Sequence, residues 1–133
     1  MVRKQLPYTQ MTLKAMRERG RYVWKVEFWN QYARRPGGEL GIRQDCFGFI
    51  DLLVIDPTEG IIAVQSTSGS CHSEHRKKIL RNDYALRWAH FNKIELWSWK
   101  NKLGNVSVSA KGWEPRIEPI TLNMFVEFAQ QAS

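Results

Sequence analysis

The sequence predicts an α/β fold in which a mixed central sheet is flanked by helices. Three observations predict it: an apolar hairpin at residues 47–67, amphipathic segments before and after that hairpin, and a further strand-like run at residues 93–100. Strands that are apolar on both faces are typical of a sheet that helices cover on both sides. We expect the 133 residues to form one domain, because a chain of this length fits a single core.

The N-terminal third of the chain contains a predicted helix, a strand and a loop. Thr9 can cap a helix over residues 10–19, which Gly20 ends. Residues 22–29 alternate aromatic or β-branched side chains with polar ones, which predicts a strand. Residues 30–44 hold several Arg, Gly and Pro residues and few apolar ones, so we expect a loop there.

The middle of the chain contains the predicted hairpin and a long helix. Residues 47–55 and 61–67 are predicted to be its two strands, and Pro57 to Gly60 form the turn. One helix is expected over residues 74–90, with Ser73 as its cap. The apolar stripe of this helix consists of Leu80, Tyr84 and Trp88.

The C-terminal part adds strands and a last helix. Residues 93–100 are predicted to form a strand whose Trp97 and Trp99 face the core. Residues 106–117 are expected to form a looser pair of strands around Gly112. Thr121 can cap an amphipathic helix that runs towards the C-terminus.

The charge balance favours a polyanionic partner. Lys and Arg number 20 against 13 Asp and Glu, which gives a formal charge of +7. Nucleic acid is the commonest partner of such a chain, although many small basic proteins bind no polyanion. Charge alone leaves both readings open.

Several classes of protein are not expected. No apolar stretch approaches the roughly 18 residues of a membrane span. Residues 1–7 lack the apolar run of a signal peptide. Cys46 and Cys71 make no disulfide framework. We therefore expect a cytoplasmic protein without a membrane partner.

An acidic residue inside an apolar strand is the first indication of a chemical site. Asp51 stands between Ile50 and Leu52. Burying an unpaired carboxylate costs several kcal/mol, so Asp51 needs a cation, a set of hydrogen-bond donors or a place at the exposed end of its strand. Gln65 and Thr67, two residues apart on the next strand, point to one face and are expected to meet Asp51.

The oxygen atoms expected near Asp51 suit Mg²⁺ or Mn²⁺. Glu27, on the same side of its strand as Lys25, adds a second carboxylate. Carboxylates, a side-chain amide oxygen and a backbone carbonyl are ligands that hard divalent cations prefer. Such a cation lowers the pKa of a bound water and shields the charge of a phosphate. The predicted metal ligands are Glu27, Asp51, Gln65 and the carbonyl of Ser66.

These residues carry a resemblance to a known superfamily. Gly48-Phe49-Ile50-Asp51, a hairpin, Ile62-Ala63-Val64-Gln65-Ser66-Thr67 and a following basic helix resemble the core of the PD-(D/E)XK nucleases, in particular archaeal-type Holliday junction resolvases and small phage nucleases. The resemblance covers about residues 10–100. It implies a restriction-endonuclease-like three-layer core, a metal-dependent DNA endonuclease with a preference for branched or junction DNA, and a two-fold homodimer.

Carried over residue by residue, the resemblance gives three positions their roles. Asp51 matches the metal-binding Asp of the motif, Gln65 stands in place of its Asp or Glu, and Thr67 stands in place of its Lys. Glu27 lies where several members carry an additional acid. Gln65 keeps an oxygen ligand but lacks the charge, which should weaken metal binding, whereas Thr67 can position water but cannot stabilise charge on a phosphate.

The missing lysine must be supplied by another residue if the protein is an enzyme. In parts of the superfamily a basic residue on the helix after the motif takes this role. The resemblance therefore implies Lys77 or Lys78 as the catalytic cation, and we favour Lys78. Lys25 is the next candidate.

Further basic and aromatic residues are candidates for contacts with DNA, with a solvated surface as the alternative in each case. Trp29 and Trp113, near predicted loops, are candidates for stacking on a base. The residues expected to contact the phosphate backbone are Arg34, Arg35, Arg43, Arg76, Lys77 and Arg81.

Two other polar groups have more than one interpretation. Cys71, His72 and His75 lack a second ligand pair for zinc, so we interpret them as polar residues at a helix start, with a phosphate contact of either His left open. Asp45 shares parity with Asp51 and is either an outer metal ligand or, as we favour, a loop cap or partner of a neighbouring Arg.

The sequence therefore predicts a metal-dependent DNA endonuclease that hydrolyses phosphodiester bonds. The alternative is a catalytically inactive DNA-binding protein on the same fold, in which neighbouring donors neutralise Asp51. DNA cleavage in Mg²⁺ or Mn²⁺, compared with EDTA, separates the two. A nucleotide preference does not follow from the sequence.

Overall fold

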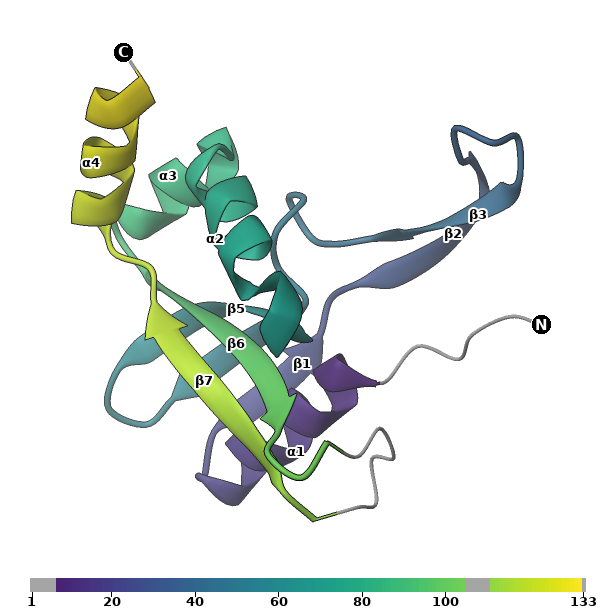
Figure 1. Ribbon diagram of the computed structural model, residues 1–133. Coiled ribbons are helices and arrows are strands. Elements are labelled where there is room, and N and C mark those ends of the chain that lie inside the picture. The colour runs from purple at the N-terminus through teal and green to yellow at the C-terminus, as the bar shows by residue number, and fades with distance from the viewer. Residues whose placement is uncertain (1–6, 105–110, 133) are drawn as a thin grey trace.

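The computed structural model describes residues 7–104 and 111–132, which form a mixed α/β structure with two sheets (Figure 1). The larger sheet has five strands and the smaller has two. The elements in chain order are α1 (Tyr8–Glu18), β1 (Tyr22–Lys25), β2 (Phe28–Arg34), β3 (Leu40–Gln44), β4 (Leu52–Asp56), β5 (Gly60–Ser68), the 3-10 helix η1 (Gly69–Cys71), α2 (His72–Leu80), α3 (Asp83–Ala89), β6 (Lys93–Asn101), β7 (Trp113–Pro119) and α4 (Leu122–Ala132).

The five-stranded sheet has the order β1-β4-β5-β6-β7. β4 and β5 form the predicted central hairpin, with Leu52 opposite Val64. β5 and β6 are parallel, and the connection between them runs through α2 and α3, as a parallel pair requires. The remaining neighbours are antiparallel, so the sheet is mixed, as the sequence predicts.

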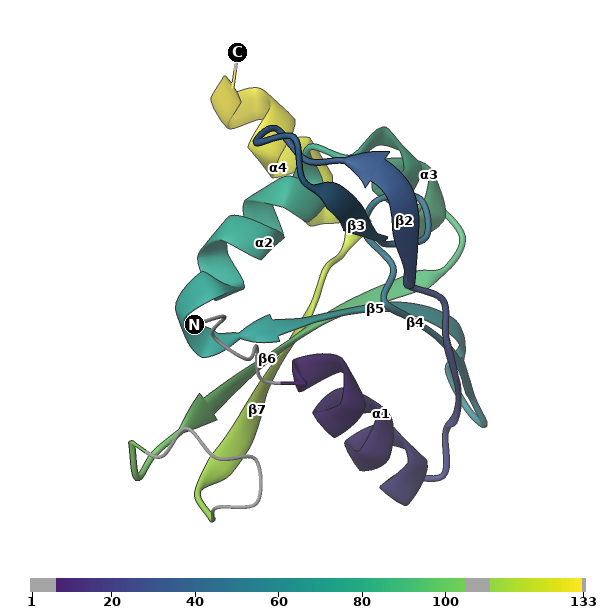
Figure 2. The same ribbon diagram turned by 90° about the vertical axis from the view of Figure 1, so that its right-hand side faces the viewer.

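Helices cover both faces of this sheet (Figure 2). α1 packs on one face, where Met16 joins a buried cluster with Leu52 and Trp97. α2, α3 and α4 pack on the other face, where Ile79 and Phe125 belong to a second buried cluster. β5 contributes to both clusters, with Ile62 and Val64 in the first and Ala63 in the second, which fits its apolar run. β4 contributes Leu52 and Val54 to the first cluster only, and Ile55 on its other face is exposed. In the described ranges, no helix has the length and apolarity of a membrane span.

The segment after β1 differs from the prediction. The expected strand over residues 22–29 divides, because β1 ends at Lys25 and β2 leaves the main sheet to pair with β3. Residues 30–44, predicted to be a loop, therefore belong largely to a β2–β3 hairpin, with Trp29 opposite Arg43. Both faces of this hairpin are largely exposed, so its sequence lacks the apolar alternation that identifies a half-buried strand.

Three boundaries near the site also differ. α1 begins at Tyr8, so Thr9 lies within the helix and is not its cap. The strand predicted from residue 47 begins only at Leu52, because Phe47 has a φ of 53° and turns the chain. α2 begins at His72, one residue before the predicted cap Ser73, and has no side-chain cap there.

The long helix predicted over residues 74–90 is two helices. The chain leaves helical geometry at Asn82, whose side chain accepts hydrogen bonds from the backbone N–H groups of Tyr84 and Ala85 and so begins α3. The break rotates Tyr84 out of the predicted apolar stripe, and its side chain is 61% exposed.

The C-terminal elements follow the prediction more closely. β6 matches the expected strand, and Trp97 and Trp99 are buried as predicted. The strand pair expected around Gly112 is one strand, β7, within the described part, and residues 105–110 lie outside it. α4 begins directly after Thr121.

Candidate metal centre

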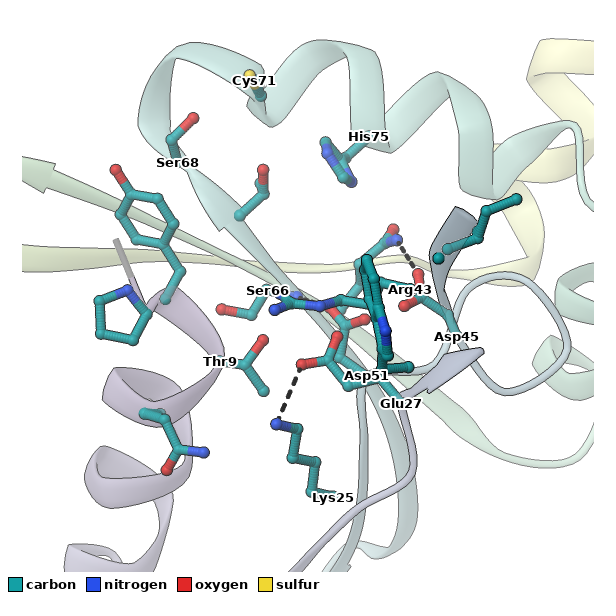
Figure 3. A pocket seen from close by; sticks show the side chains of 18 of the residues that line it. Thr9, Lys25, Glu27, Arg43, Asp45, Asp51, Ser66, Ser68, Cys71 and His75 are labelled. Atoms are coloured by element: carbon teal, nitrogen blue, oxygen red, sulfur yellow. Dashed lines mark hydrogen bonds and ion pairs between the residues drawn. The ribbon is translucent and has the colours of Figure 1, made fainter. Parts of the chain in front are cut away.

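A pocket of about 800 Å³ opens where β4 and β5 meet the N-terminal ends of α1 and α2 (Figure 3). The β2–β3 hairpin forms another of its walls. Its lining includes Lys25, Glu27, Trp29, Arg35, Arg43, Asp45, Asp51, Gln65, Ser66, Thr67, Cys71 and His75. The pocket therefore brings together most of the residues that the sequence singles out for chemistry.

Three carboxylates meet in this pocket. One oxygen from each of Glu27, Asp45 and Asp51 lies within 4.8 Å of the others. Glu27 comes from the connection between β1 and β2, Asp45 directly follows β3, and Asp51 directly precedes β4. Glu27 and Asp51 are buried and Asp45 is half-buried. We call these three residues the acid cluster.

The backbone around Asp51 fixes its position. Its N–H donates to the carbonyl of Val64 at 2.9 Å, and its carbonyl accepts from the N–H of Val26 at 3.0 Å. Its side-chain Oδ2 accepts from the backbone N–H of Ser66 at 2.8 Å. The hairpin register and the β1 connection therefore hold this carboxyl, which is only 4% exposed, at the end of β4.

The acid cluster is electrostatically strained when no cation is present. Burial raises the pKa of Asp51 far above its ordinary value, and a hydrogen bond with Asp45 and repulsion from Asp45 and Glu27 raise it further. The N–H of Ser66 opposes this effect in part. A bound cation would oppose these effects and favour the ionised carboxylate.

Gln65 places an unpaired oxygen beside the cluster. Its Nε2 donates to Asp45 Oδ2 at 3.5 Å, while its Oε1 is buried and has no hydrogen-bond partner. A buried carbonyl oxygen without a partner costs about 1–3 kcal/mol, so its partner is expected to be a group that the protein chain does not supply. Three carboxylates and this oxygen fit the donor set of Mg²⁺ or Mn²⁺.

His75 also has a buried side-chain atom without a hydrogen-bond partner. Within residues 7–104 and 111–132, the buried side-chain polar atoms without a partner are Gln65 Oε1 and His75 Nδ1, and both residues line this pocket. Burial, followed by the positive charge of Lys78, lowers the pKa of His75. Its ring points from α2 into the pocket above the acid cluster (Figure 3).

The positive charges of the pocket come from the hairpin side and not from α2. Lys25 lines the pocket, and its Nζ lies 3.7 Å from Glu27 Oε1 (Figure 3). Arg35 and Arg43 also line it. Lys77 and Lys78 are exposed and do not line it, because α2 presents Cys71 and His75 to the pocket.

The other predicted DNA contacts are dispersed. Arg76 Nε pairs with Glu118 Oε2 at 3.3 Å, on the side of α2 that faces β7. The Arg81 guanidinium lies 5.8 Å from the Phe128 ring centroid. Arg34 donates to the carbonyl of Gly38 at the tip of the hairpin.

Ser66 and Thr67 have different environments. Thr67 is buried and lines the pocket, as expected for a residue that positions water. The side-chain hydroxyl of Ser66 instead forms a hydrogen bond of 2.7 Å with Thr12 Oγ1. Thr12 Oγ1 also accepts a hydrogen bond from Trp99 Nε1 at 2.8 Å. Ser66 therefore ties α1 to the sheet, and only its backbone remains for the site.

The histidines on α2 do not form a zinc site with Cys71. His72 is buried on the opposite side, with Nδ1 2.7 Å from Ser98 Oγ and Nε2 2.9 Å from Glu118 Oε1. This Ser–His–Glu chain resembles a hydrolase triad, but Ser98 and His72 are only 1% and 2% exposed, so we interpret the chain as structural. Within residues 7–104 and 111–132, the acid cluster is the one set of three or more His, Cys, Asp or Glu side chains that lie close enough together to share a metal ion.

Sequence reasoning gave too little weight to two residues. Asp45 belongs to the acid cluster, which favours the interpretation as a metal ligand over that as a loop cap or partner of a neighbouring Arg. Its parity with Asp51 was a usable signal, although the turn at Phe47 and Gly48, not a continuous strand, brings the two together. The unpaired nitrogen of His75 had no sequence signal, because burial of a helix residue depends on the tertiary packing.

Comparisons of the chain with protein-family models, with curated proteins and with solved structures found no significant match.

Proposed function

We propose that the protein is a metal-dependent endonuclease that hydrolyses phosphodiester bonds in DNA. The observation that carries this proposal is the acid cluster with the unpaired oxygen of Gln65, in a pocket whose rim is basic. Acidic ligands for a divalent cation, next to guanidinium and ammonium groups, suit a phosphate substrate.

The order of elements supports a nuclease of the PD-(D/E)XK type with a restriction-endonuclease-like core. A helix, an antiparallel hairpin with Asp51 and Gln65 at its open end, and a helical crossover to a parallel strand are the features that the resemblance implies. The proposed homodimer and the preference for branched DNA rest on that resemblance alone. The proposed cytoplasmic location rests on the cysteine content of the sequence.

Mg²⁺ or Mn²⁺ would be held by Glu27, Asp45, Asp51 and Gln65, with the Ser66 carbonyl as a further predicted ligand. When bound, the ion supplies an activated water and shields the negative charge of the phosphate. The backbone N–H of Ser66 orients the Asp51 carboxylate through the hydrogen bond that it donates to Oδ2. Thr67 lies where it can accept or donate a hydrogen bond to water.

Lys25 is better placed than Lys77 or Lys78 to stabilise charge on the phosphate. It lies in the pocket beside Glu27, whereas the other two point to solvent. A cation at this position supplies the charge that Thr67 lacks. We therefore assign the role of the missing motif lysine to Lys25.

Lys25→Met should reduce the single-turnover rate of DNA cleavage about a hundredfold or more, because a transition-state charge contact is lost. DNA affinity should change little. Lys77→Met and Lys78→Met are the matched controls and should cleave at the wild-type rate. If either control loses activity while Lys25→Met keeps it, the cation comes from α2.

A catalytically inactive DNA-binding protein remains the second candidate. The observation that favours it is the hydrogen bond that Asp51 Oδ2 accepts from the Ser66 N–H, which, with the raised pKa of Asp51, partly satisfies the acid cluster without any ion. Such a protein would bind DNA and bind no divalent cation in the pocket.

DNA cleavage decides between the two candidates. Linear duplex, single-stranded and branched DNA are incubated with the protein in Mg²⁺, in Mn²⁺ and in EDTA. The nuclease proposal predicts products with either ion and none in EDTA. Binding of Mn²⁺, measured by electron paramagnetic resonance, is the companion measurement, and an absence of both binding and cleavage supports the second candidate.

A further inference from the structure

The β2–β3 hairpin presents an exposed indole at the mouth of the pocket. The hairpin forms its own two-stranded sheet and projects from the body of the molecule (Figures 1 and 2). Trp29 lines the pocket and is 56% exposed. Arg35 and Arg43 line the same pocket from the same hairpin.

Two features hold this indole in place. A Cβ on Gly41 would lie 2.0 Å from Trp29 Cζ2, so the ring rests against β3 at a position that only glycine leaves open. The guanidinium of Arg35 lies 5.6 Å from the ring centroid, and Arg35 Nε donates to the Gly41 carbonyl at 2.7 Å. The large side chain is therefore fixed by local contacts although much of it faces solvent.

A fixed, exposed indole beside the guanidinium of Arg35 suits one kind of ligand group. Aromatic side chains stack on nucleobases whose faces are free, and arginine binds the adjoining phosphates. In an intact duplex the base faces are covered by neighbouring pairs, and phosphate contacts alone would need no indole. The aromatic and basic surface therefore fits a nucleotide that is not base-paired.

We propose that the hairpin holds the single-stranded segment of a DNA substrate, with a base stacked on Trp29 and the adjoining phosphates on Arg35 and Arg43. This inference rests on the proposed function for the identity of the polymer and deepens it by naming the substrate class. The strand would pass from the hairpin to the acid cluster, which lines the same pocket.

Fluorescence anisotropy with labelled oligo-dT and a matched duplex, in Ca²⁺ to prevent hydrolysis, tests the proposal. Trp29→Ala should weaken oligo-dT binding by roughly fivefold to a hundredfold, the usual range for one stacked base, and duplex binding much less. Tyr32→Ala is the matched control: this residue is on the same hairpin, 82% exposed, and does not line the pocket. It should bind as the wild type does.

Two further variants test the position of the indole without its removal. Gly41→Ala should displace the ring and weaken oligo-dT binding, whereas Trp29→Phe, which keeps a smaller stacking surface, should give an intermediate loss. Oligo-dT should also quench the tryptophan fluorescence of the wild type more than that of Trp29→Phe. Circular dichroism of each variant checks that the fold is retained.

Several results would overturn the inference. They are wild-type affinity of Trp29→Ala for oligo-dT, an equal loss for oligo-dT and duplex, an equal loss in Tyr32→Ala, or tighter binding of oligo-rU than of oligo-dT. If Trp29 is needed for oligo-dT binding but the wild type never cleaves DNA, the inference stands and the nuclease proposal fails. If the wild type cleaves DNA and Trp29→Ala binds oligo-dT normally, the nuclease proposal stands and the inference about the hairpin fails.

Discussion

The carboxyl of Asp51 and the amide of Gln65 are both buried and line the same pocket. Burial keeps the pKa of Asp51 high, and the Gln65 oxygen has no donor. Each feature raises the free energy of the folded protein when no ligand is bound, and a single bound cation would offset both costs. At the scale of single residues, this shared requirement is the strongest argument for a metal site.

Asp51→Asn should change how stability depends on pH. Because the folded-state pKa of Asp51 is raised above the unfolded value of about 3.9, its stabilising contribution is full below that value and is lost as pH rises towards the folded pKa. In EDTA, the wild type should therefore lose up to about 1.4 kcal/mol per pH unit from this group, and the variant should not.

Thermal unfolding of both proteins from pH 5 to pH 8 measures this effect. The melting temperature of Asp51→Asn should rise relative to the wild type as pH increases. Glu39→Gln, at an exposed position, is the control for loss of one charge. A pH-independent difference between Asp51→Asn and the wild type would contradict the assigned pKa.

Gln65→Glu should have effects of opposite sign with and without metal. A fourth carboxylate in the pocket adds repulsion, so the melting temperature in EDTA should fall. The same charge should tighten Mn²⁺ binding, measured by calorimetry, because cation affinity rises with ligand charge. Gln31→Glu makes the same change on an exposed side chain and should do neither. Unchanged Mn²⁺ affinity would make Gln65 a structural residue.

At the scale of elements, the sequence predicted the strands whose side chains are mostly buried in the core. β5 and β6 have long apolar runs, and the structure contains them within one residue of the predicted bounds, whereas β4 begins five residues after the predicted start. The β2–β3 hairpin could not be recognised, because its side chains face solvent on both sides and follow no apolar period. The break at Asn82 was also missed, since the apolar stripe continues through it in the sequence.

Asn82 links this break to the site. Its Oδ1 caps α3, and its Nδ2 donates to the carbonyl of Phe47 at 3.0 Å, in the turn between Asp45 and Asp51. Asn82→Ala should lower the free energy of unfolding by about 1–2 kcal/mol through loss of the cap and of this bond, measured by urea denaturation. Asn82→Asp keeps the cap and should lose less. Equal stability of the alanine variant and the wild type would contradict this role.

At the scale of the whole molecule, the excess of positive charge and the acid cluster are complementary. The formal charge of +7 attracts a polyanion, while the carboxylates need a cation to let a phosphate approach. The sequence predicted Asp51, Gln65 and Glu27 as neighbours, and they share the pocket. It also named Arg35 and Arg43 as phosphate contacts, but it could not place them beside the acid cluster, because that position depends on where the β2–β3 hairpin lies.

The basic wall of the pocket consists of Arg35 and Arg43. The salt dependence of DNA binding should show whether these two residues contact phosphates. Replacing Arg35 and Arg43 with Ala should reduce the slope of log affinity against log salt by about 0.9 for each phosphate contact that is lost on duplex DNA. Replacing Lys77 and Arg81 on α2 is the comparison and should change the slope less. A larger change in the Lys77 and Arg81 variant would place the DNA on the side of α2 and not on the hairpin.

Single-turnover cleavage of branched DNA by the wild type and by Asp51→Asn, in Mn²⁺ and at equal occupancy of DNA, tests the central claim most directly. We predict cleavage by the wild type that EDTA abolishes, and a rate at least about a hundredfold lower for Asp51→Asn, because the variant loses a charge from the acid cluster while its DNA affinity is retained. Equal rates for the two proteins, or a wild type that binds DNA but cleaves it with neither Mg²⁺ nor Mn²⁺, would contradict the claim.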